Sequence, residues 1–209
     1  MLTAPRITAI ILLALLAFVA APAAIAQDSG ETADERIAHI ERLARDVESN
    51  PDDIDLLIEL GNLYYEVGMQ NEALATYLSV TELDPTHVGV LTNLGSLFTD
   101  MGQFDNAEEQ LKKAVALDPE NAMVYTNLGT NYYAGRNYFE AVEMYRQALA
   151  IDPDSVEARF NLAVAFADAQ IFDEAIREWQ KVIALDPEGA VAQTCRDNIS
   201  MINEFREGN

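Results

Sequence analysis

The stretch that decides the fold is residues 122–155, which read AMVYTNLGTNYYAGRNYFEAVEMYRQALAIDPDS. Its Pro153 belongs to a series of prolines spaced 34 residues apart, at positions 51, 85, 119, 153 and 187. Proline lacks an N–H, and its ring clashes with the preceding helical turn, so each of these prolines ends one helix or begins the next. A fixed period of this length indicates one small helical unit that is repeated along the chain.

Alignment on the prolines gives four complete units, 54–87, 88–121, 122–155 and 156–189, whose apolar positions repeat in register. In the first half of each unit the repeated residues are Leu60, Leu94, Leu128 and Leu162, followed by Gly61, Gly95, Gly129 and Ala163. In the second half they are Ala73, Ala107, Ala141 and Ala175, and then Tyr77, Leu111, Tyr145 and Trp179. The spacing within a unit is helical, so each unit is predicted to form two amphipathic helices joined by a short turn. Gly68 and Gly102 mark this turn in the first two units, and Gly135 lies one residue earlier in the third.

This pattern resembles the tetratricopeptide repeat family over residues 54–189, for example from Tyr125 and Leu128-Gly129 through Ala141, Tyr145 and Ala148 to Pro153. The resemblance implies an all-α solenoid, a right-handed superhelix of helix-turn-helix repeats whose first helices line a concave groove. Stacked repeats of this kind provide extended binding surfaces and need helices that cover their open ends.

Both ends of the repeat array have the pattern of such a capping helix. A capping box from Thr32 to Glu35 is predicted to open a helix, and residues 32–50 form an incomplete leading repeat. Residues 190–206 carry apolar side chains at helical spacing and are predicted to form the C-terminal capping helix. Cys195 is the only cysteine, so the chain cannot form an internal disulfide. It is either a small apolar residue under this cap or a thiol that pairs with another chain.

Residues 1–26 have the three parts of a secretory signal peptide, with Arg6, an apolar run from Ile7 to Val19, and Ala24-Ile25-Ala26 before the expected cleavage site. We therefore expect an exported protein of bacterial type, in the periplasm or secreted, that begins at Gln27 with a flexible lead over residues 27–31. The alternative is an uncleaved membrane anchor, for which the apolar run is short.

The formal net charge of −22 narrows the range of partners. An acidic surface repels nucleic acid and anionic lipid, and suits neutral or basic protein segments. The alternative is that the charge serves only solubility or adaptation to salt. The sequence also offers no constellation for catalysis or metal binding, because His39 and His87 are isolated and no phosphate loop or nucleophile motif is present. We expect no enzyme activity, cofactor or metal, and no membrane insertion after cleavage.

The family resemblance assigns ligand contact to the inward positions of each first helix. Carried over to this sequence, the main candidates are Asn62, Tyr65, Glu66, Asn93, Asp100, Asn127, Tyr133, Phe160, Asn161 and Asp168. The primary amides of Asn93, Asn127 and Asn161 recur one period apart and can donate to and accept from an extended peptide backbone, although asparagine is also common at this position in the family. No Lys or Arg occurs among the inward positions, so a clamp for a C-terminal carboxylate is not expected.

The predicted function is a non-enzymatic scaffold that binds an extended protein segment in the groove. Exported bacterial relatives serve in the assembly and maturation of envelope complexes, and the resemblance permits the same here. Two alternatives stay open: a structural subunit that self-associates without a groove ligand, and an accessory subunit anchored by an uncleaved N-terminus.

Overall fold

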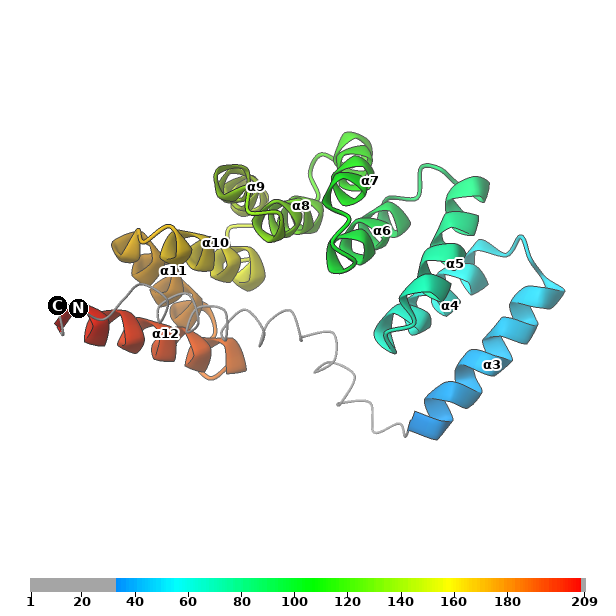
Figure 1. The fold of residues 1–209 in the computed structure, drawn as a ribbon, viewed down its shortest axis with the longest axis horizontal. Coiled ribbons are helices and arrows are strands. Elements are labelled where there is room, and N and C mark those ends of the chain that lie inside the picture. Colours follow the sequence, from blue (N-terminus) through cyan, green and yellow to red (C-terminus); the bar gives the residue numbers. More distant parts are fainter. Residues whose placement is uncertain (1–32, 208–209) are drawn as a thin grey trace. The chain divides into compact units, whose positions relative to one another are not determined.

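The computed structural model describes residues 33–207, which form ten α-helices and no strand (Figure 1). This confirms the all-α fold over the part of the chain described. The predicted signal peptide (1–26), its cleavage site, the lead (27–31) and Thr32 of the predicted capping box lie outside the described residues. Between Ala33 and Glu207, no helix is long and apolar enough to cross a membrane.

The described residues belong to two compact units. The N-terminal unit, residues 33–119, contains α3 (Ala33–Ser49), α4 (Ile54–Glu66), α5 (Gln70–Leu83), α6 (Val88–Asp100) and α7 (Phe104–Leu117). The C-terminal unit, residues 120–207, contains α8 (Ala122–Ala134), α9 (Tyr138–Ile151), α10 (Val156–Asp168), α11 (Phe172–Leu185) and α12 (Ala190–Glu207).

The N-terminal unit consists of the helix pairs α4–α5 and α6–α7, preceded by α3 (Figure 1). Tyr77 and Val80 of α5 are fully buried against apolar side chains of α4 and α6. At the other side of α4, Ile40 and Leu43 of α3 pack on Leu60. Since α3 covers apolar surface that α4 would otherwise expose, it acts as the cap of this unit.

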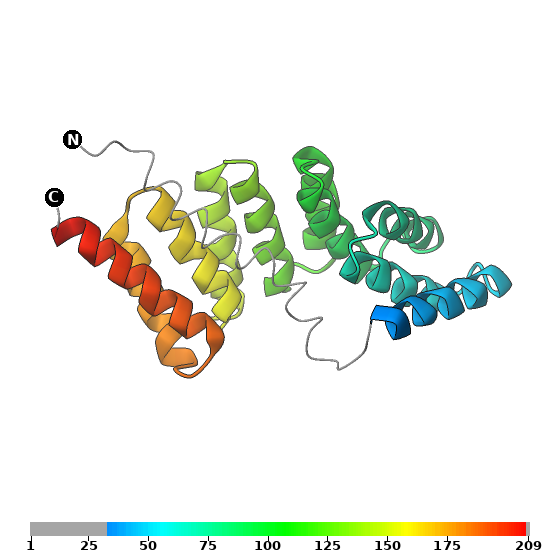
Figure 2. The same ribbon diagram turned by 60° about the horizontal axis from the view of Figure 1, so that its bottom comes forward.

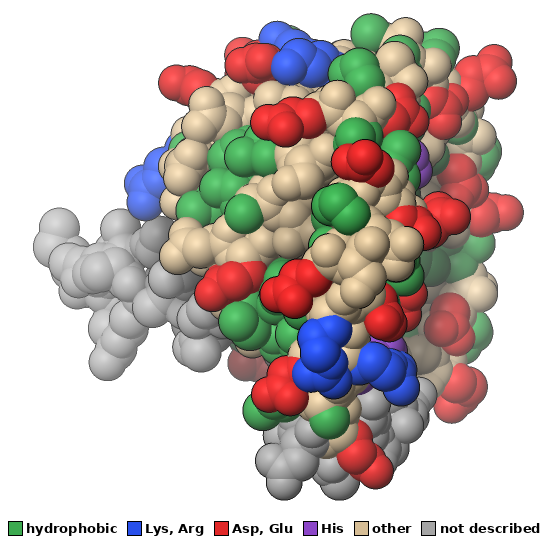
Figure 3. Space-filling view, turned by 90° about the vertical axis from the view of Figure 1, so that its right-hand side faces the viewer, with side chains coloured by type: hydrophobic (Ala, Val, Ile, Leu, Met, Phe, Trp, Pro, Cys, Tyr) green, Lys and Arg blue, Asp and Glu red, His purple; other side chains and the backbone are tan. Residues whose placement is uncertain are grey.

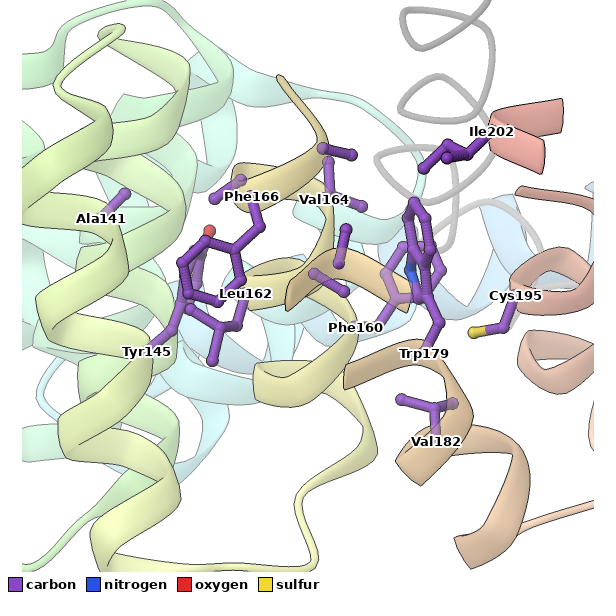
Figure 4. Close-up of a cluster of buried hydrophobic side chains, with 14 residues drawn as sticks. Ala141, Tyr145, Phe160, Leu162, Val164, Phe166, Trp179, Val182, Cys195 and Ile202 are labelled. Atoms are coloured by element: carbon purple, nitrogen blue, oxygen red, sulfur yellow. The ribbon is translucent and has the colours of Figure 1, made fainter. Parts of the chain in front are cut away.

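The C-terminal unit repeats this plan with the pairs α8–α9 and α10–α11, followed by α12, which lies against α11 (Figure 2). Its core extends from Tyr145 through Phe160 and Trp179 to Cys195 and Ile202 of the capping helix (Figure 4). Cys195 is 0% exposed, and burial raises the pKa of its thiol to about 12. This fits a packed apolar residue, because a protonated, buried thiol cannot reach another chain while α12 is in place.

Small residues allow the two helices of a pair to approach closely. A Cβ atom built on Gly61 would lie 2.6 Å from the ring of Tyr77, and one built on Gly129 would lie 2.6 Å from the ring of Tyr145. In the last pair the corresponding residue is Ala163, opposite Trp179, so a methyl group is accommodated there. A Cβ atom built on Gly95 would likewise clash with the side chain of Leu111, so glycine at this position is a packing requirement of the first three pairs.

The turns inside the four pairs share one conformation. In each, the second residue after the helix end has a positive φ: Gly68 (79°), Gly102 (71°), Arg136 (64°) and Gln170 (61°). A backbone N–H just after it closes the turn on the last helical residues, as from Met69 N to Tyr64 O (2.8 Å) and from Asn137 N to Tyr132 O (2.8 Å). In the third pair the left-handed residue is thus Arg136, and the neighbouring Gly135, which the sequence suggested as the turn marker, has an ordinary φ of −74°.

Candidate functional site

The predicted ligand-contacting residues lie on the first helices of the pairs, in two separate sets. We call the set on α4 and α6 the N-terminal face; it comprises Asn62, Tyr65, Glu66, Asn93 and Asp100. We call the set on α8 and α10 the C-terminal face; it comprises Asn127, Tyr133, Asn161 and Asp168.

On the N-terminal face, a polar network joins three helices. The side-chain oxygen of Asn62 accepts a hydrogen bond from the Tyr77 hydroxyl (2.7 Å) and another from the Asn93 amide (2.9 Å). Tyr77 is 0% exposed, and burial raises the pKa of its phenol well above 10. Since a buried hydroxyl must find a partner, this network fixes Asn62 and Asn93 as part of the fold as well as of the surface.

A second hydrogen bond on the same face spans consecutive first helices. The hydroxyl of Tyr65 on α4 donates to the Asp100 carboxylate on α6 at 2.6 Å. Asp100 is an exposed residue, but protein atoms crowd its carboxyl enough that desolvation raises its pKa, and the bond from Tyr65 only partly offsets this. The pKa of Tyr65 is also raised, first by burial and then by the neighbouring carboxylate.

The C-terminal face repeats this bond two periods later. The hydroxyl of Tyr133 on α8 donates to the half-buried Asp168 carboxylate on α10. Desolvation again raises the pKa of the aspartate, and burial followed by the aspartate raises that of the tyrosine. The buried Tyr145 takes the place of Tyr77, but its hydroxyl reaches Thr130 at 3.3 Å, a longer bond than the one to Asn62.

The three recurrent asparagines do not have equivalent surroundings. Asn93 uses its amide within the network of the N-terminal face, whereas Asn127 and Asn161 are half-buried on α8 and α10. Their contact with a ligand stays a prediction. Phe160 differs from the other candidates because it is 1% exposed and belongs to the core of the C-terminal unit. A ligand cannot reach it in this fold, so we leave it out of the C-terminal face.

The sequence reasoning missed two aromatic residues beside the C-terminal face. Tyr138, the first residue of α9, packs edge-on against Tyr133, with ring centroids 5.5 Å apart and an interplanar angle of 63°. Phe139 follows it and is 76% exposed. The repeat pattern could have revealed Phe139, because the equivalent residues of the other units are polar: Asn71, Asp105 and Asp173.

The two histidines have structural roles. The ring nitrogen Nδ1 of His87 accepts a hydrogen bond from the backbone N–H of Val90 (3.1 Å), so His87 caps the start of α6. His39 of α3 lies 3.5 Å from Glu59 of α4, between the cap and the first pair. No group of three potential metal-ligating side chains occurs among the described residues.

Comparison with known families agrees with the repeat pattern. Three models of the tetratricopeptide repeat match the chain, at residues 54–87, 86–154 and 126–190. Together they match residues 54–190 without a gap, which is more than half of the chain. None of the curated proteins compared with the sequence is similar to it.

Solved structures have the same fold. The protein TTC0263 of Thermus thermophilus, described as a thermophilic tetratricopeptide repeat protein, is similar with a TM-score of 0.68 and 22% identity, over 80% of this chain and 90% of that one. A crystal structure of MamA gives a TM-score of 0.66 and 23% identity, over 74% of this chain and 91% of that one. YrrB, described as having an unusual peptide-binding site, gives a TM-score of 0.59 and 25% identity, over 80% of this chain and 87% of that one. The tetratricopeptide repeat fold that the resemblance of the repeat pattern implied is thereby confirmed.

Proposed function

Because the chain belongs to the tetratricopeptide repeat family, we propose that it is a non-enzymatic scaffold that binds an extended protein segment on the first-helix faces of its repeats. The observation that carries this proposal is the hydrogen bond from Tyr65 to Asp100 and its repetition from Tyr133 to Asp168. In each bond the tyrosine engages one carboxylate oxygen, and neither aspartate has a further hydrogen bond or an ion pair among the described residues. Both faces therefore retain acceptor capacity for a ligand.

Two further points support a protein ligand. YrrB, which is similar in fold, is described as having a peptide-binding site. In addition, acidic side chains are scattered over the side of the molecule seen in Figure 3, among apolar and neutral ones. With a net charge of −22, such a surface favours a neutral or basic segment and disfavours nucleic acid.

We also propose that the protein acts in the cell envelope, in the assembly or maturation of a complex. This rests on the signal-peptide pattern of residues 1–26. Mass spectrometry of the protein from the cells that produce it tests the location, since export with cleavage predicts a mature chain that begins at Gln27.

Site-specific photo-crosslinking tests the binding face. A photoreactive residue is placed at exposed positions of the first helices, Glu66 and Met123, and as matched controls at exposed positions of the second helices, Ser79 and Gln147. The proposal predicts that the first-helix positions capture the same partner, identified by mass spectrometry, and that the controls do not. The affinity of the chain for this partner is then measured with the purified partner.

Other outcomes would replace the proposal. Crosslinks to the partner from Ser79 and Gln147 alone would move the binding surface to the second helices. Crosslinks only to further copies of the chain would favour the self-associating structural subunit. Replacing Asn127 and Asn161 with alanine then tests the asparagine prediction, because neither is joined to Asn62 as Asn93 is.

A further inference from the structure

The aspartates of the two Tyr–Asp pairs lack a positive partner. Asp100 and Asp168 each accept a hydrogen bond from a tyrosine of the preceding repeat, and no Lys, Arg or His of the described residues forms an ion pair with either. Other acidic residues have positive partners, as Glu178 of the C-terminal unit has in Arg159 (2.8 Å) and Lys181 (2.7 Å). A partly desolvated carboxylate without a cation costs free energy in the unbound protein.

In the C-terminal unit, aromatic rings accompany this carboxylate. Tyr133 comes from α8, Tyr138 from α9 and Asp168 from α10, so side chains of three helices form this cluster. The two rings stand edge to face, 5.5 Å apart, and the hydroxyl of one of them holds the carboxylate. The exposed Phe139 adds apolar surface next to Tyr138 in the sequence. Aromatic residues, phenylalanine and tyrosine among them, are enriched at protein–protein interfaces.

These groups together are complementary to an organic cation. A carboxylate forms charge-assisted hydrogen bonds with an ammonium or guanidinium group. The face of a tyrosine ring attracts the same cation through its quadrupole, and the aliphatic stem of lysine or arginine packs on aromatic surface. We propose that Tyr133, Tyr138 and Asp168 form a receptor for a lysine or arginine side chain of the bound protein segment, with Phe139 contacting an apolar neighbour of that side chain. This rests on the proposed function and specifies its ligand.

The alternatives fit less well. An acidic side chain would be repelled by Asp168, whose desolvation already raises its pKa. An apolar side chain alone would cover the carboxylate without neutralising it, which is unfavourable. The N-terminal unit has the pair Tyr65–Asp100 but Gln70 in place of Tyr138 and Asn71 in place of Phe139. We therefore expect the same cation to bind there more weakly.

The test uses small probes, so that it does not depend on knowing the partner. Nα-acetyl-lysine methylamide and Nα-acetyl-arginine methylamide are titrated into the mature chain and followed by NMR, with Nα-acetyl-norleucine methylamide as the uncharged control. The proposal predicts saturable shifts of the Tyr133 and Tyr138 ring signals with the two cations and not with norleucine. Asp168→Asn is expected to weaken the binding about tenfold, and Tyr138→Ala several-fold.

A matched control separates this site from the general negative charge. Asp154→Asn removes the same charge from an exposed turn of the same unit and is expected to leave binding unchanged. Equal losses in Asp154→Asn and Asp168→Asn, or equal shifts with norleucine, would overturn the proposal. Retention of the crosslinked partner by Asp168→Asn at full affinity would also overturn it while leaving the scaffold function intact. Specific binding of the cations by a protein that captures no partner would support the cation site and contradict the proposed scaffold function.

Discussion

In the N-terminal unit both helix–helix turns place glycine in the left-handed conformation, whereas the C-terminal unit places Arg136 and Gln170 there. The two units otherwise use the same parts: two helix pairs, a capping helix, a buried tyrosine in the first pair and a Tyr–Asp hydrogen bond between the first helices. A non-glycine residue with positive φ costs about 1 kcal/mol. The comparison shows that the turn is imposed by the packing of the pair, since it forms even where the local sequence opposes it.

The largest effect is expected where both units share a requirement, at the glycines that face tyrosine. Gly61→Ala and Gly129→Ala each place a methyl group against a buried ring and should lower the free energy of unfolding by about 1–3 kcal/mol. Urea denaturation measures the loss, and hydrogen exchange assigns it to one unit. Ala163→Gly is the control in the last pair, where a methyl group is already accommodated, and its loss should be about 1 kcal/mol or less. Equal stability of Gly129→Ala and the wild type would contradict the packing argument.

A smaller effect should separate the two buried tyrosines. Tyr77→Phe removes a 2.7 Å hydrogen bond to Asn62, which also binds Asn93, and should cost about 1–2 kcal/mol. Tyr145→Phe removes a 3.3 Å bond to Thr130 and should cost less, about 0.5 kcal/mol. Thermal unfolding of the two variants, whose substitutions remove the same atom, gives the difference. A larger loss for Tyr145→Phe would show that bond length is not what distinguishes the units.

Replacing the left-handed turn residues with glycine is expected to raise stability in the C-terminal unit alone, because the N-terminal unit already has glycine there. Arg136→Gly and Gln170→Gly relieve a left-handed backbone and should raise the free energy of unfolding by about 0.5–1 kcal/mol each. The reverse change, Gly68→Ala or Gly102→Ala, should lower it by a similar amount, since nothing lies within 4 Å of an added Cβ and only the backbone is strained. If Arg136→Gly lowers the stability instead, the arginine side chain contributes contacts that outweigh its backbone strain.

Much of the fold could be predicted from the sequence, because the proline period and the columns of small and large residues are properties of each repeat by itself. The position of the left-handed residue at Arg136 could not, since Gly135 beside it is the better local candidate and the helix pair decides between them. The burial of Phe160 was also missed, because family position places it on a ligand face while its surroundings place it in the core.

The candidate site was predictable only in part, for a related reason. Tyr65, Asp100, Tyr133 and Asp168 were all named from their positions, but the hydrogen bonds that pair them join side chains 35 residues apart. This offset exceeds the period by one, so it is not visible in columns aligned on the prolines. Tyr138 is on a second helix, outside the positions that family resemblance assigns to ligands, and its contact with Tyr133 follows from the close packing of α8 and α9.

The smallest expected effect concerns the pH dependence of the two Tyr–Asp pairs. The folded protein raises the pKa of Asp100 and Asp168 above the ordinary value of 3.8, so it holds a proton at a pH where the unfolded chain has lost it. Each aspartate then contributes stability below that ordinary pKa, and the contribution is lost as the pH rises through the folded pKa. Asp100→Asn and Asp168→Asn remove the titration while keeping an oxygen that accepts from tyrosine. Relative to the wild type, both variants should therefore gain stability between about pH 4 and pH 7, by about 0.5 kcal/mol because both sites are partly exposed to solvent.

Urea denaturation at several pH values measures this gain, and Asp173→Asn provides the opposite sign. Arg206 lowers the pKa of Asp173 in the folded protein, so its contribution is present above the ordinary pKa and is lost as the pH falls through the folded value. That variant should lose stability relative to the wild type as the pH rises toward 3.8 from below, a range that lies under the one in which Asp100→Asn and Asp168→Asn gain stability. If Asp168→Asn instead loses stability as the pH rises, as Asp173→Asn does, then Asp168 already has a positive partner within the chain. In that case it does not differ from the ion-paired acidic residues.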